Sequence, residues 1–175
     1  RTSGAFFFVR ATYHRGNMTI RMLVGLGNPG PEYDATRHNA GFWWVDAVAA
    51  KLGLRFAFDR SYHGLVARVN RAGQEPLWLI EPQTFMNLSG DSVGPAAGAL
   101  HAARSQVLVV HDELDLPFGV VRGKLGGGHG GHNGLRSVIE RLGGADFLRV
   151  RLGIGRPPAV FRGDQADWVL MGFNE

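Results

Sequence analysis

The run Val107–Val110 constrains the fold more than any other segment. Its residues are valines and one leucine, and no polar side chain interrupts them. A continuous apolar run rich in β-branched residues is the pattern of a strand that is buried on both faces. Sheets that contain such strands are covered by helices on both sides. The rest of the chain is therefore expected to supply helices as well as further strands.

Short apolar runs alternate with helical periodicity along the rest of the chain. The apolar runs predict further strands at residues 22–24, 64–69, 77–81 and 148–154. Apolar residues at helical spacing predict helices over residues 42–52, from Ser89 as N-cap through 96–103, and from about 133 to 142. Residues 164–170 begin a further element. This alternation predicts an α/β fold, a single globular domain with a mixed, twisted β-sheet covered by helices on both faces.

The length and composition of the chain limit what it can be. A chain of 175 residues, 45% of them hydrophobic, can bury one core but is short for two ordinary domains. No stretch reaches the roughly 18 apolar residues of a membrane span. The absence of cysteine excludes disulfides and thiolate metal sites. We therefore expect a cytoplasmic protein that has no membrane partner.

The ends of the chain carry separate expectations. Residues 1–17 precede Met18, the first plausible start, so they are interpreted as a leader or as an extension added in cloning. The domain is expected to span residues 18–175. No stop signal follows the element at 164–170, so a C-terminal helix of the domain is expected to be missing from this sequence.

Basic residues are concentrated in one part of the sequence. The net charge is +4, and residues 122–162 contain eight Lys or Arg but two Asp or Glu. Such a segment can bind a polyanion through phosphate contacts and the release of counterions. A solvated basic surface is the alternative, and composition alone does not separate the two.

The segment Gly25–Gly30 follows a predicted strand and matches the G-x-G-x-x-G pattern of dinucleotide-binding loops. A nicotinamide site is nevertheless disfavoured. Pro29 and Pro31 interrupt the loop where a helix should begin, and no acid follows at the place where it would hold a ribose. The side chain of Asn28 can instead project an amide from the end of the strand.

His38 lies at the start of a predicted helix, beside a loop. A histidine has an unperturbed pKa of about 6.5, which suits general acid–base catalysis near neutral pH. A surface or capping role is the alternative. Asn87 follows the strand at 77–81, and here too the alternative is a helix cap, a role that also suits Ser89.

The segment His111–Pro117 supplies a histidine and three carboxylates where the run Val107–Val110 ends. Catalytic groups in open α/β sheets collect beyond the carboxyl ends of strands. A metal is the alternative, but Asp112 and Glu113 point to opposite sides of an extended chain, and the spacing matches no familiar metal motif. We therefore expect no metal.

The glycine-rich segment Lys124–Gly134 leads into a predicted helix. Glycine-rich backbone before a helix N-terminus can bind an anion, and Arg122 lies just ahead of this segment. The Gly-Lys-Ser or Gly-Lys-Thr ending of a P-loop is absent. A phosphate site and a flexible lid remain equally open.

Taken together, these motifs resemble those of bacterial-type peptidyl-tRNA hydrolase. The segments that carry the resemblance occur in the order GLGNPGPEYDATRHNAG, PQTFMNLSG, HDELDLP and KLGGGHGGHNGLRS. The likeness extends from about Met22 to the end of the chain. It implies an α/β globule whose crevice gathers residues from these loops, and an enzyme that hydrolyses the ester between a peptide and tRNA.

The resemblance also implies roles for individual residues. His38 would be the base that activates water, and Asp112 would hold and polarise its imidazole. Asn28 and Asn87 would position the substrate and the attacking water. Further substrate contacts are implied for Tyr33, Met86, His132 and Asn133. Ester hydrolysis by water needs such a base, an acid that fixes its tautomer, and amide donors for the developing oxyanion.

The implied partner is the acceptor arm of peptidyl-tRNA. Arg122, Lys124 and Arg151 would bind its 5′ phosphate and backbone. The resemblance implies no cofactor, no metal and no obligate protein partner, and a monomer is expected. A non-catalytic RNA-binding relative is the alternative, which the presence of His38 and Asp112 disfavours.

Overall fold

The structure, a computed structural model, describes residues 19–173. Its strands are β1 (Met22–Gly25), β2 (Ala57–Asp59), β3 (Gly64–Arg71), β4 (Gln74–Pro82), β5 (Val107–Glu113), β6 (Val121–Leu125) and β7 (Leu148–Gly153). Its α-helices are α1 (Ala40–Lys51), α2 (Gly90–Ala99), α3 (Asn133–Leu142) and α4 (Gln165–Val169). Shorter 3-10 turns are η1 (Arg37–Asn39), η2 (Met86–Leu88) and η3 (Arg104–Gln106). The predicted leader, residues 1–17, lies outside the described residues.

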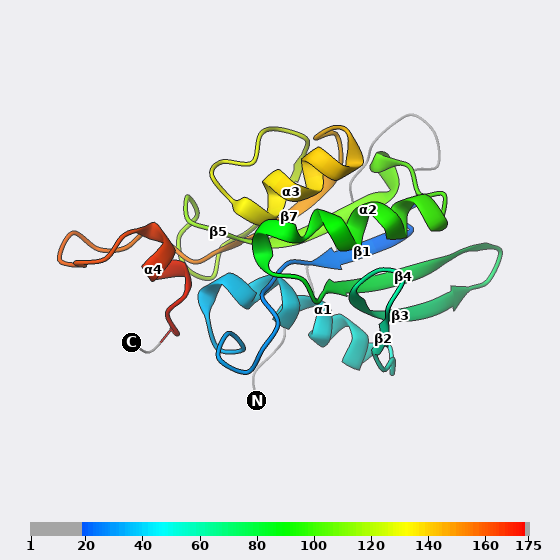
Figure 1. The fold of residues 1–175 in the computed structure, drawn as a ribbon, viewed down its shortest axis with the longest axis horizontal. Helices are drawn as coiled ribbons and strands as arrows, with labels where there is room; N and C mark the ends of the chain where they lie inside the picture. Colours follow the sequence, from blue (N-terminus) through cyan, green and yellow to red (C-terminus); the bar gives the residue numbers. More distant parts are fainter. Residues whose placement is uncertain (1–18, 174–175) are drawn as a thin grey trace.

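Within the described range, seven strands form one mixed sheet in the order β2-β3-β4-β1-β5-β7-β6 (Figure 1). The four adjacent strands β4, β1, β5 and β7 run parallel to one another. In contrast, β3 pairs antiparallel with β4, β2 with β3, and β6 with β7. The predicted α/β fold with a mixed sheet is confirmed. In this range no helix is long and apolar enough to cross a membrane.

The apolar run that predicted a central strand forms β5, which lies between β1 and β7. Alternate residues of the central strands face different cores, because successive side chains point to opposite faces of a sheet. Val24 of β1 packs with Val93 of α2 and Val138 of α3. Its neighbour Leu23 packs with Val45 of α1. Figure 1 shows α2 and α3 on one face of the sheet and α1 on the other.

Neither β2 nor β6 is predicted from the sequence. All five residues of β6 are exposed, so this strand has no buried apolar face by which it could be recognised. Its conformation comes from antiparallel pairing with β7. β2 is three residues long, and its pairing with β3 likewise cannot be seen in its own sequence.

The prediction for the helix after Ser89 is correct at its start and wrong at its end. Ser89 is the N-cap residue of α2, but its hydroxyl donates to the carbonyl oxygen of Met86 at 2.7 Å and does not cap the helix. The helix ends at Ala99 and does not continue to Ala103. His101, with φ of 50°, turns the chain back toward β5.

Gly41 allows α1 to approach the carboxyl end of the central strands. A Cβ atom at this position would lie 2.5 Å from the carbonyl oxygens of Leu26 and Val110. A side chain could be accommodated there only if α1 moved away. The helix therefore begins directly against the ends of β1 and β5, and this contact brings the preceding turn η1 to the end of β5.

Candidate active site

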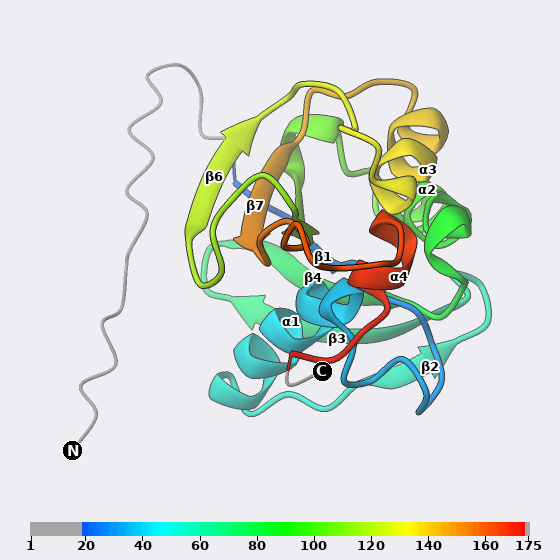
Figure 2. The ribbon, with the colours of Figure 1, turned by 90° about the vertical axis from the view of Figure 1, so that its left-hand side faces the viewer.

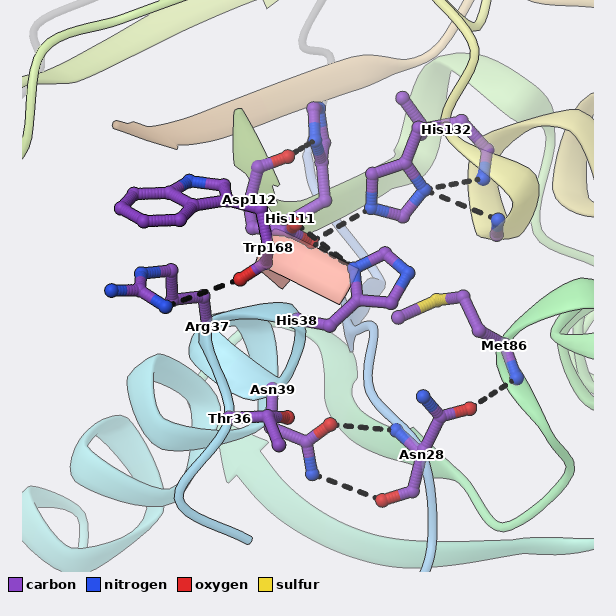
Figure 3. A network of polar contacts seen from close by, with 12 residues as sticks. Asn28, Thr36, Arg37, His38, Asn39, Met86, His111, Asp112, His132 and Trp168 are labelled. Atoms are coloured by element: carbon purple, nitrogen blue, oxygen red, sulfur yellow. Dashed lines mark hydrogen bonds and ion pairs between the residues drawn. The ribbon is translucent and has the colours of Figure 1, made fainter. Parts of the chain in front are cut away.

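His38 and Asp112 meet at the carboxyl edge of the sheet (Figure 3). His38 lies in η1, and its Nδ1 atom is 2.9 Å from each carboxylate oxygen of Asp112. Asp112 lies near the end of β5 and is 2% exposed. The fold thus brings together the two residues to which the sequence analysis assigns catalysis.

Asp112 also contacts a second histidine, His132, whose Nε2 atom is 2.8 Å from Oδ1. Burial by itself raises the pKa of Asp112. The imidazoles of His38 and His132 outweigh burial, through charge and hydrogen bonding, and hold this pKa well below its usual value. The carboxylate is therefore ionised at neutral pH and accepts hydrogen bonds without donating any. We refer to His38, Asp112 and His132 as the His–Asp–His cluster.

His132 connects this cluster to the start of α3. It is the N-cap residue of α3, and its Nδ1 atom accepts from the backbone N–H groups of Gly134 at 3.1 Å and Leu135 at 3.3 Å. Its ring centroid is 4.9 Å from that of His38. The glycine-rich segment thus places His132 in contact with the buried Asp112, and the backbone amides at the start of α3 hold its ring.

His111 packs against the other side of His132, with ring centroids 5.1 Å apart. It is 2% exposed, and its Nδ1 atom is 2.8 Å from the carbonyl oxygen of Asp112. Burial, followed by the charge of His132, lowers the pKa of His111 to about 3, so the ring is neutral. From the sequence, His111 is expected to matter only in the metal alternative. Its position directly before Asp112, at the end of a predicted buried strand, could have indicated that it lies at the site.

Asn28 is fixed in place by Asn39 and Met86. Its backbone N–H donates to Oδ1 of Asn39 at 2.8 Å, and Nδ2 of Asn39 donates to the carbonyl oxygen of Asn28 at 2.9 Å. Oδ1 of Asn28 accepts from the backbone N–H of Met86 at 2.7 Å. Among the described residues none accepts a hydrogen bond from Nδ2 of Asn28, so this group is left for a ligand. Asn39 was not predicted as a site residue, although its place beside His38 in the same motif was a signal.

The other residues expected to contact substrate surround these groups. Met86 is buried, and Tyr33 packs edge-on against the exposed ring of Phe85, with centroids 6.2 Å apart. Asn87 in η2 and Asn133 at the start of α3 are exposed. Within the described part of the chain, their side chains make no hydrogen bond to the His–Asp–His cluster. In the sequence, Asn133 directly follows His132 of the cluster, and Asn87 directly follows Met86.

Basic side chains on β6 and β7 share one face of the sheet. Arg122 lies opposite Arg151, and Lys124 lies opposite Arg149, in the antiparallel register. Directly opposite residues point to the same side. Lys124, Arg149 and Arg151 line a cavity of about 330 Å³ that also reaches His111. Of the residues expected to bind phosphate, Lys124 and Arg151 share this cavity, and Arg122 lies beside it.

Arg149 was not predicted as a site residue, and it holds the glycine-rich loop. It is 2% exposed and donates to the carbonyl oxygens of Gly127 and Gly128, each at 2.6 Å. Burial lowers its pKa. Arg151 is more accessible, and its guanidinium lies 3.6 Å from Glu113. Arg149 is therefore committed to the backbone of the loop, whereas Arg151 is partly exposed and pairs with Glu113.

The C-terminal segment braces the turn η1. The buried guanidinium of Arg37 donates to the carbonyl oxygen of Trp168 at 3.1 Å and lies 3.8 Å from the centroid of the Trp168 ring. The backbone N–H of Arg37 donates to the carbonyl oxygen of Met171 at 3.0 Å, and Thr36 forms a β-bridge with Gly172. Figure 2 shows α4 beside the start of α1. Residues near the C-terminal end of the described chain thus hold the turn that carries His38.

The His–Asp–His cluster is also the group of described residues that could hold a metal ion. One ligand atom from each residue lies within 4.8 Å of the others. Hydrogen bonds already account for these distances. The metal alternative raised by the sequence, centred on His111–Pro117, is not the arrangement found, because Asp112 alone from that segment belongs to this group of described residues.

Known proteins share both the sequence and the fold. The family model described as peptidyl-tRNA hydrolase matches residues 22–175. The peptidyl-tRNA hydrolases of Variovorax paradoxus and Delftia acidovorans are each 56% identical to this chain over 86% of its length, and the matches cover 70% and 72% of those proteins. The crystal structure of the peptidyl-tRNA hydrolase of Acinetobacter baumannii matches with a TM-score of 0.81 and 46% identity, covering 87% of this chain and 76% of that one.

Proposed function

Because this chain belongs to the peptidyl-tRNA hydrolase family, we propose that it cleaves the ester between a peptide, or another N-blocked aminoacyl group, and tRNA. The products are the peptide acid and free tRNA. The observation that carries the proposal is the pair of 2.9 Å contacts from His38 Nδ1 to the buried Asp112. A base held by an ionised acid is what direct attack by water requires.

His38 acts as the general base. Its Nδ1 atom faces Asp112, so Nε2 points away from the carboxylate and is free to take a proton (Figure 3). Water attacks the ester carbonyl carbon while Nε2 removes its proton, and a tetrahedral intermediate forms. The intermediate expels the ribose oxygen of the tRNA, which receives that proton from His38. Asp112 stays ionised and stabilises the imidazolium between the two steps.

Asn28 supplies a hydrogen-bond donor to the substrate. Because its Oδ1 accepts from Met86, its Nδ2 group has a fixed direction. A preorganised amide donor of this kind stabilises negative charge on the carbonyl oxygen as the intermediate forms. Asn87 and Asn133 position the peptide and the attacking water from the rim, and Tyr33 contacts the 3′ end of the tRNA.

Lys124 and Arg151 bind the 5′ phosphate of the acceptor arm in the cavity that they share. Arg122, opposite Arg151, extends the basic surface along β6 toward the tRNA backbone. Contacts to phosphates position a nucleic acid without reading its sequence.

The reaction assigns no step to a metal, because His38 and Asp112 activate water directly, and we therefore propose that it is metal-independent. The proposed site is built from one chain, which fits a monomer. A cytoplasmic location follows from the location of the substrate, and the absence of cysteine suits that reducing compartment.

The decisive experiment is release of N-acylated amino acid from N-acyl-aminoacyl-tRNA, with a chelator present. His38→Asn keeps a hydrogen-bond donor near Asp112 but removes the base, and kcat should fall by about 10²–10⁴-fold. His101→Asn is the matched control, since His101 is exposed and remote from the site. Its carbonyl oxygen accepts a hydrogen bond from Arg21, which directly precedes β1, so His101 lies at the amino ends of the central strands. Equal activity of the His38→Asn and His101→Asn proteins would contradict the base assignment. If the parent chain bound tRNA in a salt-sensitive way but did not hydrolyse the ester, the proposal that it is an enzyme would be contradicted.

A further inference from the structure

Both ring nitrogens of His132 are engaged in hydrogen bonds. Nδ1 accepts from the backbone N–H groups of Gly134 and Leu135, at 3.1 and 3.3 Å. Nε2 lies 2.8 Å from Oδ1 of Asp112. A backbone amide can only donate, so Nδ1 is unprotonated, and the neutral ring must carry its proton on Nε2. His132 therefore donates to Asp112.

This assignment extends through Asp112 to His38. The ionised carboxylate accepts from Nε2 of His132 and has no proton of its own to give. Nδ1 of His38 contacts the same carboxylate at 2.9 Å, so it must be the donor there. Nε2 of His38 is then left without a proton. The reactive tautomer of His38 thus follows from hydrogen bonds that begin at the backbone amides of α3.

We infer that His132 is a positioning residue, which fixes the orientation of Asp112 and through it the tautomer of His38. The inference rests on the proposed function, because it explains how the proposed base is kept in its reactive form. It replaces the substrate-binding role that the family resemblance implied for His132, since neither ring nitrogen is left for a substrate. For the same reason His132 is not a second base, although its ring lies 4.9 Å from that of His38.

The surroundings of His132 hold its ring in this orientation. The neutral ring of His111 packs edge-on against it. At Gly134 a Cβ atom would lie 3.1 Å from Cε1 of His132 and 2.5 Å from Sδ of Met86, so the backbone of α3 approaches the imidazole closely. Turning the ring over would leave the amides of Gly134 and Leu135 without their acceptor.

The tautomers can be measured without any assay of activity. In protein labelled with ¹⁵N, long-range ¹H–¹⁵N correlation spectra near neutral pH distinguish protonated from unprotonated ring nitrogens. We expect Nδ1 of His132 to be unprotonated and Nε2 protonated, with the opposite arrangement in His38. A proton on Nδ1 of His132, or on Nε2 of neutral His38, would overturn the inference. This result does not depend on whether the chain hydrolyses peptidyl-tRNA, so failure of the proposed function would be recognised separately.

Two substitutions at His132 separate its two hydrogen bonds. His132→Asn retains an acceptor for the helix amides, because asparagine is a preferred N-cap, but its side chain is too short to reach Asp112. His132→Gln places an amide N–H where Nε2 was. On N-acyl-aminoacyl-tRNA we expect His132→Asn to lower kcat by about 10–100-fold, by analogy with the loss of the hydrogen-bond partners that orient metal-ligating side chains, with KM little changed.

The pH profile supplies a readout that a merely structural role would not move. Loss of the donor to Asp112 makes the carboxylate a better partner for the imidazolium of His38, so the acid limb of the kcat profile should move to higher pH in His132→Asn. His132→Gln should restore most of kcat and return the acid limb toward its original place. A rise in KM in both variants, with kcat and the acid limb unchanged, would show a substrate contact and overturn the inference.

Discussion

Arg122 and Arg151 lie directly opposite each other on the antiparallel strands β6 and β7. Like charges in this relationship repel each other and destabilise strand pairing. Lys124 and Arg149 repeat the arrangement further along the same strands. Glu113 offsets part of this repulsion at Arg151, and a phosphate bound between the remaining charges would offset more of it.

Replacing Lys124 and Arg151 by glutamine should weaken the enzyme's hold on full-length peptidyl-tRNA. We expect KM to rise and kcat to be retained, because the substituted residues lie in the cavity and not in the His–Asp–His cluster. KM should also depend less on salt, since each lost phosphate contact reduces the logarithmic salt slope by about 0.7–0.9. Steady-state kinetics between about 50 and 200 mM salt would measure both effects.

The control for this experiment is Arg68→Gln, which removes an exposed arginine from β3, near the opposite edge of the sheet. It should leave KM and its salt dependence unchanged. A minimal ester substrate without the acceptor stem should not distinguish the parent from the double variant. An equal rise in KM for the minimal substrate would argue against a phosphate contact.

Gly41→Ala should separate His38 from Asp112. The new Cβ atom would lie 2.5 Å from two carbonyl oxygens, so α1 must move away from the strand ends. Overpacking of this kind costs about 1–3 kcal/mol in the free energy of unfolding. We expect hydrolysis to fall further than stability alone predicts, because η1 moves with α1. Urea unfolding and kcat measured on the same preparation test the two parts.

Gly98→Ala is the matched control in α2. A Cβ atom at Gly98 meets nothing within 4 Å, and alanine is favoured over glycine inside a helix by roughly 0.5–1 kcal/mol. This variant should be slightly more stable than the parent and equally active. Equal losses of stability at Gly41 and Gly98 would contradict the close approach of α1 to the strands.

Glu81 should make the stability of the fold depend on pH. It is 3% exposed in β4, and burial, followed by the hydrogen bond and charge of Asp46 on α1, raises its pKa from 4.5 to about 9. The folded chain therefore keeps a proton that the unfolded chain releases. This contribution to stability is complete below pH 4.5 and is lost as the pH rises through about 9.

Glu81→Gln removes this titration. Relative to the parent, the variant should gain stability as the pH rises across the same window, by at most about 1.4 kcal/mol per pH unit. Urea unfolding at several pH values measures the difference. Glu140→Gln changes an exposed glutamate on α3 and should show no such trend. A constant difference between Glu81→Gln and the parent at all pH values would refute the raised pKa of Glu81.

Arg37→Lys should loosen the turn that carries His38. Lysine keeps the charge but lacks the planar guanidinium that both donates to Trp168 and stacks on its ring. We expect a loss of about 1–2 kcal/mol in the free energy of unfolding and a lower kcat. Arg68→Lys, beside Trp78 on strands remote from the site, is the control for a cation over an indole. Lost stability with an unchanged kcat would mean that the brace does not position His38.

Much of the site could be predicted because its chemistry lies in short, dense segments. Val107–Val110 indicated a buried central strand, and a strand of that kind ends where catalytic groups collect. This reasoning placed the acids of His111–Pro117 where catalytic groups are expected, and the resemblance to peptidyl-tRNA hydrolase singled out Asp112 and His38. Both residues were found without knowledge of the 2.9 Å contact between them.

The other features of the fold and the site could not be predicted, because they depend on pairings between distant parts of the chain. β6 carries no apolar pattern, and its register opposite β7 determines which basic residues share a face. The part played by His132 follows from the backbone donors that face its Nδ1 and the carboxylate acceptor that faces its Nε2, and sequence spacing does not encode this. Asn39 and Arg149 were missed because each holds backbone groups of a loop that the sequence analysis examined for ligands alone.

The contact between Arg37 and Trp168 joins residues that are 131 positions apart. During synthesis, Arg37 and His38 are available long before the segment that braces them. Contacts of such large sequence separation form late, because a long loop must first be closed. We therefore expect hydrolytic activity to appear at the end of refolding, after the secondary structure has formed. The rate of turnover during refolding then reports how many molecules have formed the contact between Arg37 and Trp168.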